Sequence, residues 1–179
     1  MKTRIVLIPI ALLAFSVIAL AQTPAQAPQP GPEVKRLEYF AGTWTTETEM
    51  KAGPMGSGGK MISTDKSQMM PGGFFLVTHT EGSGTLGEVK EMAVMGYDAV
   101  SKQYTYDSYN NFGEAQHFKG TVEGDTWTWL GDLKPGSPVK LRFIAKEVSP
   151  KQYTMRLEMM MQSGGNWLPL LSGRATRAK

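Results

Sequence analysis

The sequence contains no cysteine and only two histidines in 179 residues. The absence of cysteine excludes disulfides, thiolate metal sites, cysteine nucleophiles and thiol redox chemistry. Two histidines do not suffice for a multi-histidine centre, and we expect neither a bound metal nor a resident cofactor. The length suits a single domain, which can form a stable core without a covalent or metal staple.

The chain also lacks a cluster of lysine and arginine, although its formal net charge is +3. Lys2 and Arg4 precede an apolar leader, and without them the basic and acidic residues nearly balance. Proteins that bind nucleic acid normally present a basic patch or stripe. We therefore expect no nucleic-acid partner.

The first 21 residues have the layout of a secretory signal peptide. A positively charged start precedes an apolar run from Ile5 to Leu20, which is too short to span a bilayer comfortably. Ala19-Leu20-Ala21 matches an A-x-A cleavage site. We expect cleavage after Ala21 and export to the periplasm or the medium, with no integral membrane segment left. The alternative is an uncleaved N-terminal anchor.

Residues 22–32 read QTPAQAPQPGP and contain no large apolar side chain. Such a segment cannot bury enough surface to offset its ordering entropy, so we expect a disordered, extended linker. The folded domain is expected over residues 33–179. It opens with a predicted helix over Glu33–Phe40, because Val34, Leu37 and Phe40 recur at three-residue spacing on one face.

After Gly42, short runs with period two alternate with turn residues. Ten short strands with tight links favour an up-and-down meander, which needs closure because open sheet edges invite aggregation. The sequence therefore predicts an all-β fold, an up-and-down antiparallel β-barrel of about ten strands with a short helix closing one end. A two-sheet sandwich is the alternative. The predicted strands are Thr43–Lys51, Lys60–Met70, Gly73–Glu81, Glu88–Asp98, Gln103–Tyr109, Glu114–Val122, Thr126–Leu130, Val139–Val148, Gln152–Met161 and Trp167–Thr176.

The start of the domain, Leu37-x-x-Phe40-x-Gly42-x-Trp44, resembles the calycin superfamily. Lipocalin-like barrels of that superfamily begin with a closing helix and a Gly-x-Trp strand. The resemblance implies that Gly42 and Trp44 are structural, with Trp44 at the barrel floor under an arginine of the last strand. Arg174 and Arg177 are the candidates for this cation–π contact, and Arg174 is favoured.

A narrower resemblance is carried by Met95-Gly96-Tyr97-Asp98 and Tyr104-Thr105-Tyr106-Asp107, together with the leader, the linker and the Gly-Thr-Trp start. These features are similar to a bacterial secreted family catalogued as domain of unknown function 1579. The resemblance covers roughly residues 33–176. It implies a lipocalin-like barrel and brings no established activity.

Haem-binding, nitrobindin-like barrels also open with Gly-x-Trp, but they continue it as Gly-x-Trp-x-Gly-x-Gly and ligate haem through a C-terminal histidine. Here Thr45-Thr46-Glu47-Thr48 follows Trp44, and the last two predicted strands contain no histidine. Both departures argue against haem.

Several strands place aromatic and sulfur-containing side chains on one face, which we interpret as the barrel interior. Core filling, cross-strand aromatic pairing and thioether binding of Cu(I) are the alternatives for these residues. The residues predicted to line a ligand cavity are Val77, His79, Tyr104, Tyr106, Trp129, Met155 and Met159.

The favoured function is binding of a small apolar or amphipathic molecule in the barrel, an inference from architecture. A second hypothesis is a small hydrolase- or isomerase-like enzyme, which requires His79 or His117 inside, near a carboxylate. A third is a structural or interaction module with a filled barrel, which predicts no internal cavity. No residue is assigned a catalytic role, and the oligomeric state stays open.

Overall fold

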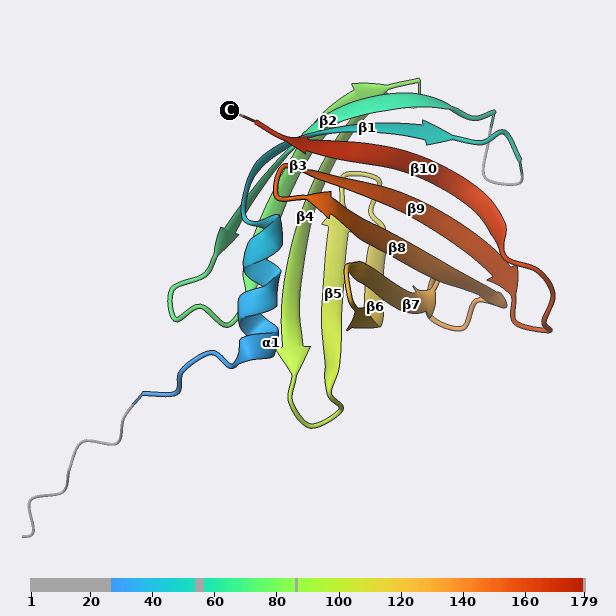
Figure 1. Cartoon of the computed structure of the whole chain (residues 1–179). Coiled ribbons are helices and arrows are strands. Elements are labelled where there is room, and N and C mark those ends of the chain that lie inside the picture. The colour runs from blue at the N-terminus through green and yellow to red at the C-terminus, as the bar shows by residue number, and fades with distance from the viewer. Residues whose placement is uncertain (1–26, 54–56, 86, 179) are drawn as a thin grey trace, which may run out of the picture.

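The computed structural model describes residues 27–53, 57–85 and 87–178. The predicted signal peptide and the first part of the predicted linker lie outside these residues. Over the described ranges the chain folds into a closed antiparallel barrel of ten strands, with a short helical segment across one end (Figure 1). This confirms the predicted fold class and excludes the sandwich. No helix in these ranges has the length and apolar character needed to cross a membrane.

The helical segment consists of α1, Pro32–Lys35, and a 3₁₀ turn, η1, Arg36–Phe40. All ten strands run antiparallel to their neighbours in the chain, and β1 pairs with β10 to close the barrel. The strands are β1 Gly42–Met50, β2 Gly59–Met69, β3 Leu76–Gly84, β4 Gly87–Asp98, β5 Gln103–Asn110, β6 Ala115–Glu123, β7 Thr126–Asp132, β8 Val139–Ser149, β9 Gln152–Met161 and β10 Leu168–Arg177.

The helical segment closes its end of the barrel with the three side chains that the sequence places on one face. Val34, Leu37 and Phe40 are all buried. The Phe40 ring packs edge-on against Trp127 at a centroid distance of 5.2 Å and against Tyr153 at 5.3 Å. This end of the barrel is therefore a filled aromatic core, and free space is left only further along the interior.

The floor tryptophan is covered by Arg177, which corrects the expectation that Arg174 takes this place. The Arg177 guanidinium lies 4.3 Å from the centre of the Trp44 ring, and it donates to the Tyr39 and Ala41 carbonyls. Arg174 lies on the outer face of β10, where it pairs with Glu47 at 3.1 Å. Strand alternation explains the difference, because Arg177 shares the inward face with the fully buried Ala175.

Gly42 is required at the start of β1 by both its backbone and its surroundings. Its φ of +111° lies where L side chains are strained, and a Cβ there would collide with the Arg177 guanidinium. The Gly-x-Trp sequence thus links the turn from the helix, the floor tryptophan and its covering arginine.

Candidate functional site

A cavity of about 240 Å³ lies inside the barrel beyond the aromatic floor. Its wall on β1–β4 is mostly polar, whereas its wall on β6–β10 is mostly aromatic and aliphatic. The main polar lining residues are Thr46, Thr48, Ser63, Asp65, Ser67, Thr78, Thr80 and Glu91. The main apolar ones are Phe118, Trp129, Phe143, Ala145, Tyr153, Met155, Leu157 and Leu171. This division makes the cavity amphipathic.

Two carboxylates dominate the polar wall, and the strand register places them in one row. Asp65 of β2 is directly opposite Thr80 of β3, and Thr80 is directly opposite Glu91 of β4. Adjacent strands lie about 4.8 Å apart, so the two acidic residues flank Thr80 at a backbone separation of about 10 Å. All three side chains line the cavity.

Glu91 is held in the interior by a tyrosine from the neighbouring strand. Tyr106 Oη donates to Glu91 Oε1 at 3.2 Å. Burial raises the pKa of the Glu91 carboxyl, Asp65 and Glu114 raise it further, and the hydrogen bond from Tyr106 lowers it. Burial also raises the pKa of Tyr106 well above its ordinary value, so this hydroxyl keeps its proton and acts as a donor.

Asp65 accepts hydrogen bonds from two hydroxyls on the same wall. Thr46 Oγ1 donates to Asp65 Oδ2 at 2.5 Å, and Ser63 Oγ donates to Asp65 Oδ1 at 3.4 Å. The pKa of Tyr153 is raised mainly by burial and also by the negative charge of Asp65. These hydrogen bonds orient the Asp65 carboxylate on the polar wall of the cavity, across from the aromatic wall.

The aromatic wall is a stack that starts at the helical segment and ends in the cavity. The Arg36 guanidinium lies 5.5 Å from the Trp127 ring centre, Trp127 stacks on Trp129 at 5.5 Å, and Trp129 stacks on Phe143 at 5.6 Å. Trp129 is only 1% exposed, and its Nε1 has no hydrogen-bond partner among the described residues. The ring therefore backs the wall from within the core and presents almost no surface of its own to the cavity.

The structure brings three of the predicted lining residues together in the cavity, namely Tyr106, Trp129 and Met155. Tyr104 and Met159 are buried in the core but do not line the cavity. Tyr104 instead donates its hydroxyl to the Glu33 carbonyl at 3.0 Å, below the helical segment. The ligand-binding role of these residues stays a prediction.

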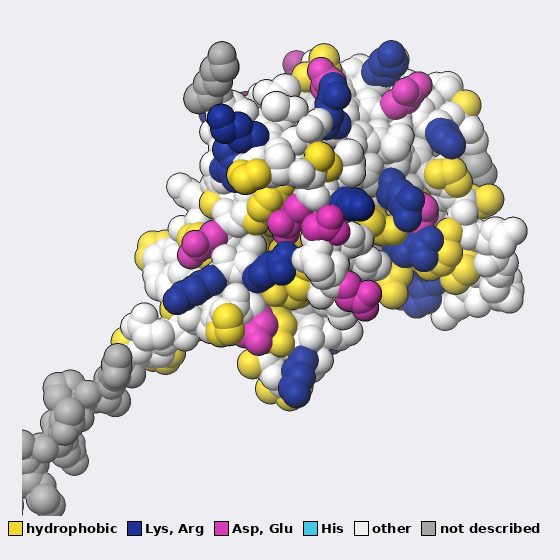
Figure 2. Space-filling model, in the orientation of Figure 1, with side chains coloured by type: hydrophobic (Ala, Val, Ile, Leu, Met, Phe, Trp, Pro, Cys, Tyr) yellow, Lys and Arg dark blue, Asp and Glu magenta, His cyan; other side chains and the backbone are white. Residues whose placement is uncertain are grey.

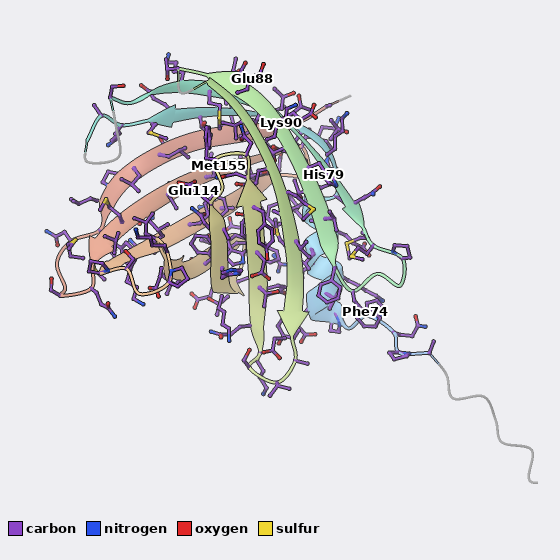
Figure 3. The ribbon with its side chains drawn as sticks, turned by 180° about the vertical axis from the view of Figure 1, so that it is seen from behind. Phe74, His79, Glu88, Lys90, Glu114 and Met155 are labelled. Atoms are coloured by element: carbon purple, nitrogen blue, oxygen red, sulfur yellow. The ribbon has the colours of Figure 1, made fainter. Side chains whose placement is uncertain are left out.

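Val77 and His79 lie on the outer face of β3, which corrects their predicted place in the cavity. His79 borders a shallow outer hollow, and the alternate residues Thr78 and Thr80 point inward. Figure 3 shows His79 at the outside of β3 and Met155 within the barrel. Val77 faces outward because it alternates with Leu76 and Thr78, whose side chains point into the barrel.

The enzyme hypothesis requires a histidine inside the barrel, and the structure places neither histidine there. His117 lies on the outer face of β6, where its Nδ1 is 2.7 Å from Asp107 Oδ1 and more than half of its side chain is exposed. Among the described residues, no group of three or more His, Cys, Asp or Glu side chains could hold a metal ion.

Neither interior carboxylate was predicted from the sequence to line the cavity. The sequence does contain a signal for Glu91, because this acid stands in a row of apolar residues on one face of β4. The other residues on that face are Val89, Ala93, Met95 and Tyr97. Asp65 has no such signal, since its face of β2 also carries Ser63 and Ser67 and is typical of a solvated surface.

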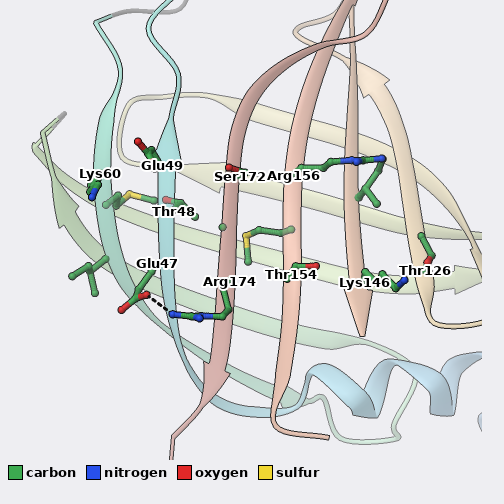
Figure 4. A pocket seen from close by; sticks show the side chains of 15 residues that line it. Glu47, Thr48, Glu49, Lys60, Thr126, Lys146, Thr154, Arg156, Ser172 and Arg174 are labelled. Carbon is green, nitrogen blue, oxygen red and sulfur yellow. Dashed lines mark hydrogen bonds and ion pairs between the residues drawn. The ribbon is translucent and has the colours of Figure 1, made fainter. Parts of the chain in front are cut away.

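A second hollow lies on the outside of the barrel, across β1, β2 and β7–β10 (Figure 4). Lys60, Lys146, Arg156 and Arg174 line it, together with Glu47 and Glu49. The Arg174–Glu47 pair is more than half exposed on both sides. Figure 2 shows charges of both signs interspersed over one face of the molecule. This groove is open and charge-mixed, so the internal cavity is the better candidate site.

A family model described as "Protein of unknown function (DUF1579)" matches residues 29–177. The chain belongs to this family. None of the curated proteins compared with this DUF1579 member matches it significantly.

Similar solved structures are barrels of low sequence identity. The S-type phycobiliprotein lyase CPES from Guillardia theta has a TM-score of 0.56 and 12% identity, covering 81% of this chain and 92% of that chain. A de novo designed fluorescence-activating β-barrel has a TM-score of 0.44 and 15% identity, with coverages of 79% and 95%. The redesigned barrel mFAP1, bound to DFHBI, has a TM-score of 0.43 and 15% identity, with coverages of 78% and 96%. At 12% identity, the likeness to the lyase shows the fold alone.

Glu91→Gln should change how stability depends on pH. Because burial raises the pKa of Glu91 in the folded protein, folding favours the protonated carboxyl. The stability of the wild type therefore falls as pH rises from the unfolded-state pKa through the folded-state pKa. The variant should match the wild type near about pH 4 and become the more stable of the two by about pH 8.

Urea denaturation across this pH range measures the difference. Glu88→Gln is the matched control, since Glu88 lies on the outer face of the same strand and is exposed. If the free energies of unfolding of Glu91→Gln and the wild type differ by the same amount at every pH, burial does not raise the pKa of the Glu91 carboxyl.

Proposed function

We propose that this DUF1579 protein binds a small amphipathic molecule inside its barrel. The observation that carries the proposal is the internal cavity of about 240 Å³, with a polar wall facing an aromatic one. Small-molecule sites are typically concave and mostly apolar, with a few placed polar groups that fix orientation. A filled barrel would leave no such space, so the cavity favours a binding protein over a purely structural module.

Two features suit the cavity to a bound molecule. Its polar groups are already oriented by protein hydrogen bonds, as in the contacts of Asp65 with Thr46 and of Glu91 with Tyr106. Its aromatic wall is stiffened by the stack from Trp127 through Trp129 to Phe143. A preformed site loses little conformational freedom on binding, which favours affinity.

The proposal predicts that filling the cavity abolishes binding. Met155 lines the cavity from β9, and Met155→Trp places a bulkier ring in the free space. A neutral N-phenylnaphthylamine dye, whose emission rises in apolar surroundings, should bind the wild type saturably. Affinity should fall at least about tenfold in Met155→Trp and stay within about threefold in Met155→Leu, because volume-conserving swaps are tolerated.

Fluorescence titration of the three proteins measures these affinities, and circular dichroism checks that both variants are folded. If the wild type shows no saturable binding, or if a folded Met155→Trp protein binds the dye as well as Met155→Leu, the cavity is not the binding site.

We also propose that the protein is exported, on the strength of the leader sequence. The mature chain should then begin at Gln22. Expression of the full chain in a Gram-negative host, followed by fractionation and intact-mass measurement, tests this. A cleaved product outside the cytoplasm supports export, and a full-length product held at the membrane would identify the uncleaved anchor instead.

A further inference from the structure

Among the described residues, those lining the internal cavity include two acids and no basic side chain. Of the described residues that line it, Asp65 and Glu91 are the only ionisable groups apart from tyrosines, and none is lysine, arginine or histidine. Neither carboxylate forms an ion pair with a described cationic side chain. Buried charges are normally paired, because removing them from water is costly.

The two carboxylates also lie close to each other on one wall of the cavity. They flank Thr80 in the same cross-strand row, and the charge of Asp65 acts on Glu91. The hydroxyl donors of Thr46, Ser63 and Tyr106 satisfy part of their hydrogen-bonding capacity. None of these neutral donors balances the negative charge, so a positive group placed between the two acids would meet two complementary partners.

The other wall of the cavity is apolar and suits an uncharged body. Trp129 backs this wall but is only 1% exposed, because Trp127 and Phe143 stack on its ring. Phe143, Tyr153 and Leu157 are only partly buried, and they supply the apolar surface across the cavity from the acids. Small-molecule sites typically combine such an apolar lining with a few placed polar groups.

We propose that the ligand is an organic cation, namely an ammonium or amidinium group attached to an aromatic or branched apolar body. Its positive group lies between Asp65 and Glu91, and its body packs against Phe143 and Leu157. This inference rests on the proposed binding function and adds the chemical class and orientation of the ligand. An inorganic cation would use the acids but leave the aromatic wall without an occupant.

A matched series of probes tests the charge requirement on the wild-type protein. Phenylbutylamine, phenylbutanol and phenylbutyrate share one apolar body and carry a positive, neutral and negative head group. In calorimetric titrations at neutral pH, the amine should bind at least about tenfold more tightly than the alcohol, and the acid should bind most weakly. Magnesium chloride, as a bare cation, should give no saturable heat.

The outcomes separate this inference from the proposed function. If the alcohol or the acid binds as tightly as the amine, the cavity binds small molecules but does not select cations, and only the inference fails. If none of the three probes binds while the neutral dye does, the inference also fails. If neither the probes nor the dye bind, the proposed function fails with it.

Variants of the acidic row assign the effect to the two carboxylates. Asp65→Asn and Glu91→Gln each keep the size of the side chain and remove its charge, and each should weaken amine binding about tenfold while leaving alcohol binding within about threefold. The double variant should remove the preference for the amine. A folded double variant that retains this preference would overturn the proposal.

Thr80→Lys provides a gain-of-charge test that does not depend on removing a hydrogen-bonded group. An ammonium built at the centre of the row would occupy the proposed cation position, so amine binding should be lost. Thr80→Met is the matched control, because it has a similar length without charge and should keep the preference for the amine over the alcohol. Equal amine binding by folded Thr80→Lys and Thr80→Met proteins would contradict the proposed position of the cation.

Discussion

Replacing Trp127 with alanine should lower the free energy of unfolding by about 3–5 kcal/mol, the usual cost of truncating a buried large aromatic side chain. Trp127 is fully buried. Its ring contacts Phe40, Tyr104 and Trp129 at centroid distances between 4.8 and 5.5 Å. The substitution removes the central member of the aromatic stack and separates the helical segment from the cavity wall.

The lost stability has two sources, namely the packing of the Trp127 ring and the hydrogen bond of its indole nitrogen. Trp127 Nε1 donates to Glu147 Oε1 at 2.7 Å, and Arg36 approaches the same oxygen at 3.0 Å. Trp127→Phe keeps most of the ring but loses this hydrogen bond, so it should cost about 1–3 kcal/mol. Urea denaturation measures both variants, with Trp167→Ala as the control, because Trp167 is only half-buried and lies beside Arg142. If Trp127→Ala lowers the free energy of unfolding no more than Trp167→Ala does, the aromatic end of the barrel is not tightly packed around Trp127.

Replacing Arg177 with methionine should cost about 2–3 kcal/mol, the scale of hydrogen bonds made by a charged donor. The guanidinium donates to the carbonyls of Tyr39, Ala41 and Pro150 while it covers Trp44. These contacts fix the end of the helical segment and the turn between β8 and β9 to the last strand. Without Arg177, several carbonyls at the closed end lose their partner.

Arg174→Met is the matched control, because it removes the same side chain from the outward face of the same strand. Its ion pair with Glu47 is exposed on both sides, and such pairs contribute about 0–1 kcal/mol. Comparison of the two variants by urea denaturation decides which arginine covers the floor tryptophan. A larger loss for Arg174→Met than for Arg177→Met would reverse the assignment.

The barrel itself could be predicted closely from the sequence because its turns are marked by glycine, proline, asparagine and aspartate. The largest shift is in β3, which the sequence predicts over residues 73–81 and the structure places at Leu76–Gly84. Gly82 and Gly84 look like turn residues, but both belong to β3. A Cβ at either position would collide with β2. Close approach between strands, rather than a turn, requires glycine there.

The inward faces of the strands were harder to predict, because the rule that apolar residues point inward does not hold for every strand of this barrel. It holds for Trp127 and Trp129 on β7 and for Met155 on β9, which face the interior. It fails around the start of β3, where Phe75 and Val77 face outward on either side of the buried Leu76. Phe75 covers Gly96 of β4, at which a Cβ would collide with its ring.

The acidic row could not be predicted for a related reason. Asp65 and Glu91 are far apart in the sequence, and neither belongs to a motif with a recognisable spacing. They meet only because β2, β3 and β4 pair in a register that aligns both with Thr80. Register of this kind depends on the closed barrel as a whole and is not visible in any one strand.

A crystal structure of the protein grown with phenylbutylamine tests the central claim most directly. We expect the phenyl ring inside the barrel against Phe143 and Leu157, with the amine nitrogen at hydrogen-bond distance, about 2.7–3.2 Å, from a carboxylate oxygen of Asp65 or Glu91. An empty barrel in those crystals, or a ligand whose amine points away from both carboxylates, would contradict it.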